Sequence, residues 1–106
     1  MSTSQHQEFD TRLDKIITQL LLPLRISKSI DVDSLKELNK LLSDVTTLYA
    51  ESEMIPRQLT GNLWFIFTSM LSEAEHTRNL EPILNIAWEL QEKLRRIFGP
   101  RFSSHP

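Results

Sequence analysis

Apolar residues recur three and four positions apart in four segments of the chain, which is the spacing of an amphipathic helix. The segments begin near Glu8, Ser34, Pro56 and either Asn79 or Glu81. Their periodic apolar positions are Phe9, Leu13, Ile16, Ile17, Leu20 and Leu24; Leu35, Leu38, Leu42, Val45 and Tyr49, widened by Leu41 and Leu48; Leu59, Leu63, Ile66, Phe67, Met70 and Ala74; and Ile83, Ala87, Leu90, Leu94 and Ile97. Short links between the segments predict an all-α fold, a small up-down bundle of four helices. The fallback is a three-helix core with a loose N-terminal helix.

Residues at the ends of these segments predict the helix boundaries. Pro23 lacks an amide donor and clashes with the preceding turn, so the first helix should stop or kink there, with Arg25–Val32 as the connection. Ser34 and Glu37 have the spacing of a capping box, which predicts Ser34 as the N-cap of the second helix. Gly99 should end the fourth helix in a left-handed conformation.

The run Leu63–Phe67 is the one segment with a competing interpretation, because its five apolar residues also have β preference. The following residues Ser72–Arg78 are compatible with a helix, and no turn signal interrupts the run. We therefore assign it to the third helix.

Composition limits the classes of protein to which the chain can belong. Its 106 residues are enough for one domain, with residues 1–7 and 101–106 expected to be disordered tails. The absence of cysteine excludes disulfides, zinc fingers and thiol catalysis, and only two glycines leave no phosphate-binding loop. A net charge of −2 gives no general attraction to nucleic acids or anionic membranes. Residues 1–10 lack the features of a secretory signal, and no apolar stretch is long enough to span a membrane, so a cytoplasmic location is expected.

Two residues in the third segment have the spacing of a metal-binding motif. Glu73 and His76 form Glu-x-x-His, which di-iron bundles use twice together with two further glutamates. The other histidines, His6 and His105, lie near the termini without such a partner. We therefore expect no metal and no cofactor. No serine, histidine and aspartate can be assigned as a catalytic set, so we expect no enzyme.

Asp33, Ser34 and Leu35 at the start of a helix resemble the signature of acyl carrier proteins, in which the serine carries a phosphopantetheine arm. The resemblance covers these three residues and implies a carrier function with Ser34 as the modified residue. An N-cap explains the same serine. An acyl-carrier-like or small-ligand-binding bundle is therefore an alternative.

The one basic cluster consists of Lys93, Arg95, Arg96 and Arg101. Cations at the end of a helix complement its dipole, and the cluster lacks the interleaved aromatics of a nucleic-acid surface. A nucleic-acid-binding regulator is a second alternative, and nucleic acid is not the partner that the sequence favours.

The third segment is apolar over more of its circumference than a plain bundle helix requires. At 100° per residue, Phe65 points nearly opposite to the inner face, among Gly61, Thr68 and Ser72. Large apolar residues also flank this outward face on the third and fourth segments: Trp64, Leu71, Leu84 and Trp88. These eight residues are the predicted partner-binding site. The alternative is that the third helix is central and buries all of its apolar residues.

Taken together, the patterns favour a non-enzymatic, cytoplasmic protein-binding module. Its partner would be another protein or a second copy of the chain in a homodimer. Immunity proteins, antitoxins, adaptors and secretion chaperones are small helical proteins of this general kind, and the functional hypothesis places the chain among them.

Overall fold

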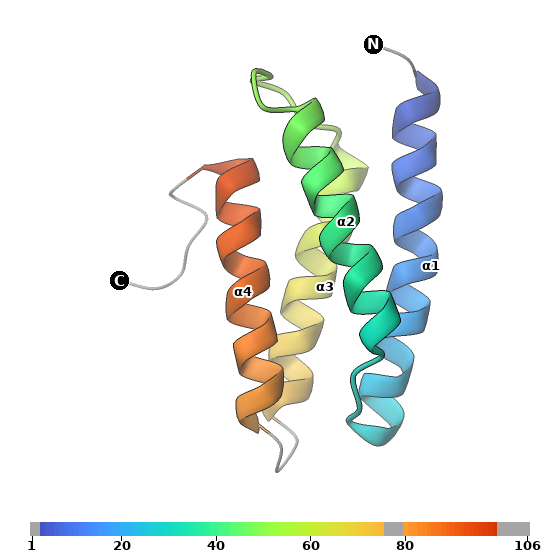
Figure 1. Ribbon diagram of the computed structural model, residues 1–106, viewed down its shortest axis with the longest axis vertical. Coiled ribbons are helices and arrows are strands. Elements are labelled where there is room, and N and C mark those ends of the chain that lie inside the picture. Colours follow the sequence, from blue (N-terminus) through green and yellow to red (C-terminus); the bar gives the residue numbers. More distant parts are fainter. Residues whose placement is uncertain (1–2, 76–79, 100–106) are drawn as a thin grey trace.

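The computed structural model describes residues 3–75 and 80–99 of the chain (Figure 1). These residues form four helices, and none of them forms a strand: α1 (Thr3–Ser27), α2 (Val32–Leu48), α3 (Arg57–Glu75) and α4 (Leu80–Phe98). The prediction of a small all-α four-helix bundle is confirmed, and the run Leu63–Phe67 lies inside α3.

The helices alternate in direction, so α1 and α3 run one way while α2 and α4 run the other (Figure 1). α1 packs against α2 and α3, and α4 packs against α3 and α2. Consecutive helices α2 and α3 therefore lie on a diagonal of the bundle, and the link of residues 49–56 crosses its end. As a result, α1 and α3 are parallel neighbours.

The core contains most of the periodic apolar residues of the four helices, while Ile17, Leu35, Leu48 and Ile97 are partly buried and pack against it. The buried set is Phe9, Leu13, Ile16, Leu20, Leu24, Leu38, Leu41, Leu42, Val45, Tyr49, Leu59, Leu63, Ile66, Phe67, Met70, Ala74, Ile83, Ala87, Leu90 and Leu94. All six inner residues predicted for the third helix are in this set. Five of its members belong to α1, so α1 is part of the core and the fallback with a loose first helix does not describe the fold.

Of the two outcomes predicted at Pro23, a stop or a kink, the stop is wrong, because α1 continues through Pro23 to Ser27 and only residues 28–31 form the connection. Proline removes one amide donor, which leaves the carbonyl of Gln19 without its helical partner. Gln19 is exposed, so this turn lies on the solvent side of α1. Beyond the proline, Leu24 is fully buried, and this burial stabilises the last turn.

The start of α1 at Thr3 lies inside the segment expected to be an N-terminal tail. The other expected tail, residues 101–106, lies outside the described residues, as do residues 1–2.

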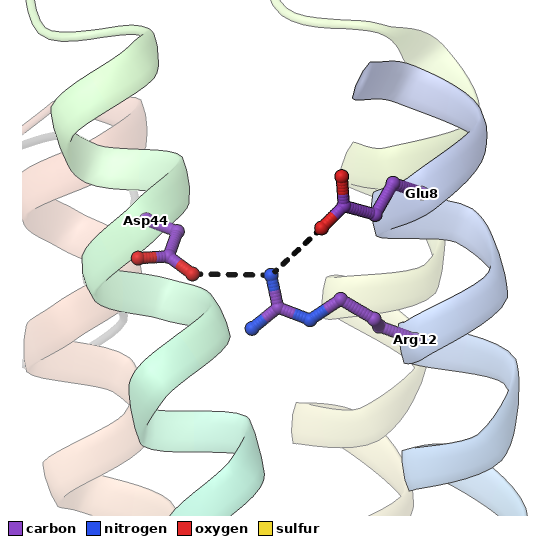
Figure 2. Close-up of polar contacts among 3 residues, drawn as sticks. All are labelled: Glu8, Arg12 and Asp44. Atoms are coloured by element: carbon purple, nitrogen blue, oxygen red, sulfur yellow. Dashed lines mark hydrogen bonds and ion pairs between the residues drawn. The ribbon is translucent and has the colours of Figure 1, made fainter. Parts of the chain in front are cut away.

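An ion pair joins the outer sides of α1 and α2. Arg12 donates a hydrogen bond from Nη1 to Oδ2 of Asp44 at 3.1 Å, and the same nitrogen lies 3.9 Å from Oε1 of Glu8 (Figure 2). The guanidinium carbon also lies 5.9 Å from the ring centre of Phe9, within cation–π range. The contact lies at the edge of the core and holds the first half of α1 against α2.

α2 begins about one turn earlier than the capping box predicted, so the prediction of Ser34 as the N-cap is wrong. The N-cap is Asp31, whose carbonyl accepts the amide of Leu35 at 3.0 Å, and the helix begins at Val32. Ser34 occupies the third helical position, is buried, and donates its hydroxyl to the Asp31 carboxylate. The Asp31 side chain makes no capping hydrogen bond to a backbone amide, and its carboxylate instead accepts the hydroxyl of Ser34.

Other helix ends agree with the sequence to within a residue. The carbonyl of Pro56 accepts the amide of Thr60 at 3.1 Å, and α3 is assigned from the next residue, Arg57. Gly99 has φ 104° and donates its amide to the carbonyl of Arg95 at 2.8 Å. This left-handed glycine ends α4 as predicted.

Leu42→Ala should lower the free energy of unfolding by about 2–5 kcal/mol, because Leu42 is 2% exposed and its truncation leaves a cavity. The neighbouring exposed Ser43 is the matched control, and Ser43→Ala should stay within about 0.5 kcal/mol of the wild type. Urea unfolding followed by circular dichroism measures both. Equal effects of the two substitutions would contradict the assigned core.

Candidate functional site

The exposed side of α3 carries two adjacent aromatic residues. Trp64 is 49% exposed and Phe65 is 51% exposed. We call this side the outer α3 face, and its exposed residues are Arg57, Gln58, Gly61, Trp64, Phe65, Ser72 and Glu75. Between Gln58 and Ser72 the face has no charged residue.

Helix geometry explains why these aromatics are exposed. Leu63, Ile66 and Met70 point into the core and are fully buried. Each residue advances by 100°, so Trp64 lies at the edge of the buried stripe and Phe65 lies nearly opposite to it. The alternative in which α3 buries all its apolar residues is therefore wrong for these two positions.

On the α4 side, the predicted site residues pack within their own chain. The ring of Phe67 has its centre 5.9 Å from that of Trp64 and 6.4 Å from that of Trp88. Leu71, Leu84 and Trp88 are partly buried and pack against the core. This flank is thus an apolar wall built by α3 and α4, beside which Trp64 projects.

On the α1 side, an open groove of about 420 Å³ runs between the parallel helices α1 and α3. Phe65 forms part of its wall, and Leu22 of α1, 52% exposed, contributes another apolar side chain. The full lining is Ile17, Thr18, Leu21, Leu22, Arg25, Phe65, Ser69, Ser72 and Glu73. Sequence reasoning missed Leu22. The run of three leucines at positions 20–22 could have indicated an exposed leucine, because successive helical positions point 100° apart and cannot all face the core.

Lys28 and Glu73 form an ion pair between the end of α1 and α3, beside the groove. Lys28 has φ 56°, a left-handed conformation that is uncommon for a residue other than glycine. Its amide donates to the carbonyl of Leu24 at 3.0 Å, which closes the last turn of α1. The ion pair holds this end of α1 against α3 and leaves Glu73 engaged within the chain.

The small residues of the outer α3 face differ in their environment. Gly61 is exposed, and a Cβ atom built on it would meet no atom within 4 Å, so its own chain makes no close approach there. Thr68 is half-buried and donates its hydroxyl to the carbonyl of Trp64 at 3.0 Å. Internal packing therefore does not require a glycine at position 61.

The other chemical candidates gain no support from the geometry. His76 lies outside the described residues, and within the described part no three His, Cys, Asp or Glu side chains gather as a metal site. Ser34 is 2% exposed with its hydroxyl bonded to Asp31, a position unsuited to carrying a prosthetic arm.

The basic residues near the end of α4 are mostly engaged with neighbouring side chains. Arg95 donates two hydrogen bonds to Glu92, at 2.7 and 3.1 Å, and Lys93 donates to Oδ1 of Asn39 at 2.5 Å. Arg96 lines a groove between α4 and α2, while Arg101 lies outside the described residues. Arg95 and Arg96 lie in the last turn of α4, where they complement the helix dipole.

Comparison with protein-family models, curated proteins and solved structures gives no match to this chain. Among the described helices, none has the length and apolar character needed to cross a bilayer.

Substitutions at Lys28 should separate backbone strain from the ion pair. Lys28→Ala loses the ion pair and keeps the left-handed strain, whereas Lys28→Gly loses the ion pair and relieves the strain. The glycine variant should therefore be about 1 kcal/mol more stable than the alanine variant. Thermal and urea unfolding measure the difference. An alanine variant as stable as the glycine variant would show that position 28 is not left-handed.

The pKa of Glu92 should respond to Arg95. The hydrogen bond from Arg95, aided by its charge and that of Arg96, lowers the pKa of Glu92 below the ordinary glutamate value. A lowered pKa in the folded state means that this contribution to stability is present above the unfolded pKa and lost as pH falls through the folded one. Arg95→Gln should raise the pKa of Glu92, as measured by NMR titration of its carboxyl carbon. An unchanged titration curve would mean that the pair does not form in solution.

Proposed function

We propose that this protein is a non-enzymatic protein-binding module, and that its docking surface is the outer α3 face together with the groove between α3 and α1. The observation that carries the proposal is the pair of adjacent aromatics, Trp64 and Phe65, each about half exposed at 49% and 51%. Tryptophan is enriched among the residues that dominate binding energy, and phenylalanine is enriched in protein interfaces relative to the rest of the surface.

The internal packing of the chain does not account for Phe65. The core is closed by Leu63, Ile66 and Phe67 on the other side of the same turns, all of them buried. Half of the Phe65 ring remains in contact with water, and covering it with another apolar surface is favourable. Leu22, across the groove, extends the same apolar area onto α1.

The chemistry of the face favours a protein partner. Between Gln58 and Ser72 the outer α3 face has no charged residue, and the groove beside it is lined by one cation, Arg25, and one carboxylate, Glu73. A single cation does not make the basic patch that binds a phosphate backbone, and depletion of charge is typical of the centre of a protein interface. Immunity proteins, antitoxins, adaptors and chaperones remain the kinds of protein that this proposal covers.

Two phenylalanines on α3 provide a matched test. Phe65→Ala should change the free energy of unfolding of the monomer by less than about 1 kcal/mol, because its ring is half exposed. Phe67→Ala should lower it by about 3–5 kcal/mol, because its ring is buried. Binding should respond in a different way, with Phe65→Ala weakening the affinity for the partner about 30-fold, or about 2 kcal/mol.

The partner is identified by photo-crosslinking in the cells that make the protein. A photoreactive phenylalanine analogue replaces Phe65 in one sample and the exposed Lys36 of α2 in the control. We expect one protein chain to be crosslinked at position 65 and absent at position 36, and the same purified chain to bind the wild type in solution. The proposal is wrong if no protein is crosslinked at position 65, or if Phe65→Ala binds the identified chain as tightly as the wild type.

A further inference from the structure

The outer α3 face has opposite charges at its two ends. Arg57 begins the helix and Glu75 ends it, and both are exposed. The third charged residue of α3, Glu73, forms an ion pair with Lys28. Everything between Gln58 and Ser72 on this face is uncharged, so the face is positive at one end, apolar in the middle and negative at the other end.

The two charges also lie on one line along the helix. They are separated by eighteen positions, which is five full turns at 3.6 residues per turn and about 27 Å along the axis. Such a face is complementary to a copy of itself that runs in the opposite direction.

We infer that the partner of this face is a second copy of the chain, with the two α3 helices antiparallel across a two-fold axis and Arg57 of each copy opposite the partner's Glu75. The inference rests on the proposed function, because it names the chain that occupies the same face. A two-fold axis repeats each contact, so the pair of charges would be matched at both ends of the interface. A parallel arrangement would place like charges side by side, which is unfavourable.

The register set by these charges brings the exposed aromatics together. When residue 57 lies opposite residue 75 of the partner, the two-fold axis passes beside position 66. Trp64 and Phe65 then lie next to the axis, within about 3 Å along the helix at a rise of 1.5 Å per residue. Residues that dominate binding gather at the centre of an interface. The charges and the aromatics, which are separate features of α3, therefore indicate the same register.

The flanks of α3 complete the interface. The two-fold axis is perpendicular to the plane that contains the two α3 helices. It therefore places the α1 sides of both copies on the same side of this plane, next to each other. Phe65 of each copy then lies near the other's Phe65, beside the groove in which Leu22 is exposed. On the opposite side, Trp64 and the partner's Trp64 adjoin the walls formed with α4. Gly61, with open space above it, lets the partner's helix come close.

Charge reversal provides the test, with dimerisation measured by sedimentation over a range of concentrations. The wild type should dimerise. Arg57→Glu and Glu75→Arg should each weaken self-association at least tenfold, because each replaces two attractive pairs by two repulsive ones. When the two single variants are mixed, they should form a heterodimer about as strong as the wild-type homodimer, since every pair across that interface is again attractive. Lys36→Glu, an exposed reversal on α2, is the control and should leave dimerisation unchanged.

The outcomes separate this inference from the proposed function. A wild type that stays monomeric at millimolar concentration overturns the inference, as does a dimer that responds equally to all three reversals or a mixture of single variants that fails to associate. If crosslinking at position 65 then still captures a different protein whose affinity depends on Phe65, the docking surface stands and only the identity of the partner is wrong. If position 65 captures nothing, both are wrong.

Discussion

The regular turn of an α-helix places two aromatic side chains on the surface of this bundle. Five consecutive apolar residues, Leu63–Phe67, cannot all reach one core when each is rotated by 100° from the last. Leu63, Ile66 and Phe67 take the inner positions, and Trp64 and Phe65 are left about half exposed. The exposure of these two aromatics follows from the local sequence and the helical period, because the inner positions of α3 are already filled by other apolar residues.

The arrangement of the four helices determines what surrounds these aromatics. α3 has α1 and α4 as neighbours and lies on the diagonal from α2, so one side of it is not covered by another described helix. Since α1 and α3 run in parallel with a groove between them, Phe65 shares a surface with Leu22, which comes from a distant part of the sequence. The candidate site is therefore a combination of one helix face and the flank of a second helix.

Three polar side-chain pairs in the described part of the chain join one helix to another. Arg12 contacts Asp44 across α1 and α2, and Lys93 contacts Asn39 across α4 and α2. The left-handed Lys28 contacts Glu73 of α3. Arg57 and Glu75 make no ion pair with another described residue, which leaves the charges at the ends of the outer α3 face available to a partner.

The sequence alone determined the four helices, the inner stripe of each, the glycine end of α4 and the outward direction of Phe65, because all of these depend on residue spacing within one helix. Tertiary packing decided the rest. α1 continues past Pro23 with Leu24 buried, and α2 has its N-cap at Asp31 with Ser34 buried in the first turn. Exposure of Leu22 depends on which helix lies beside α1, and periodicity within a segment contains no information about its neighbours. For that reason the aromatic face could be predicted from the sequence, whereas the groove beside it could not.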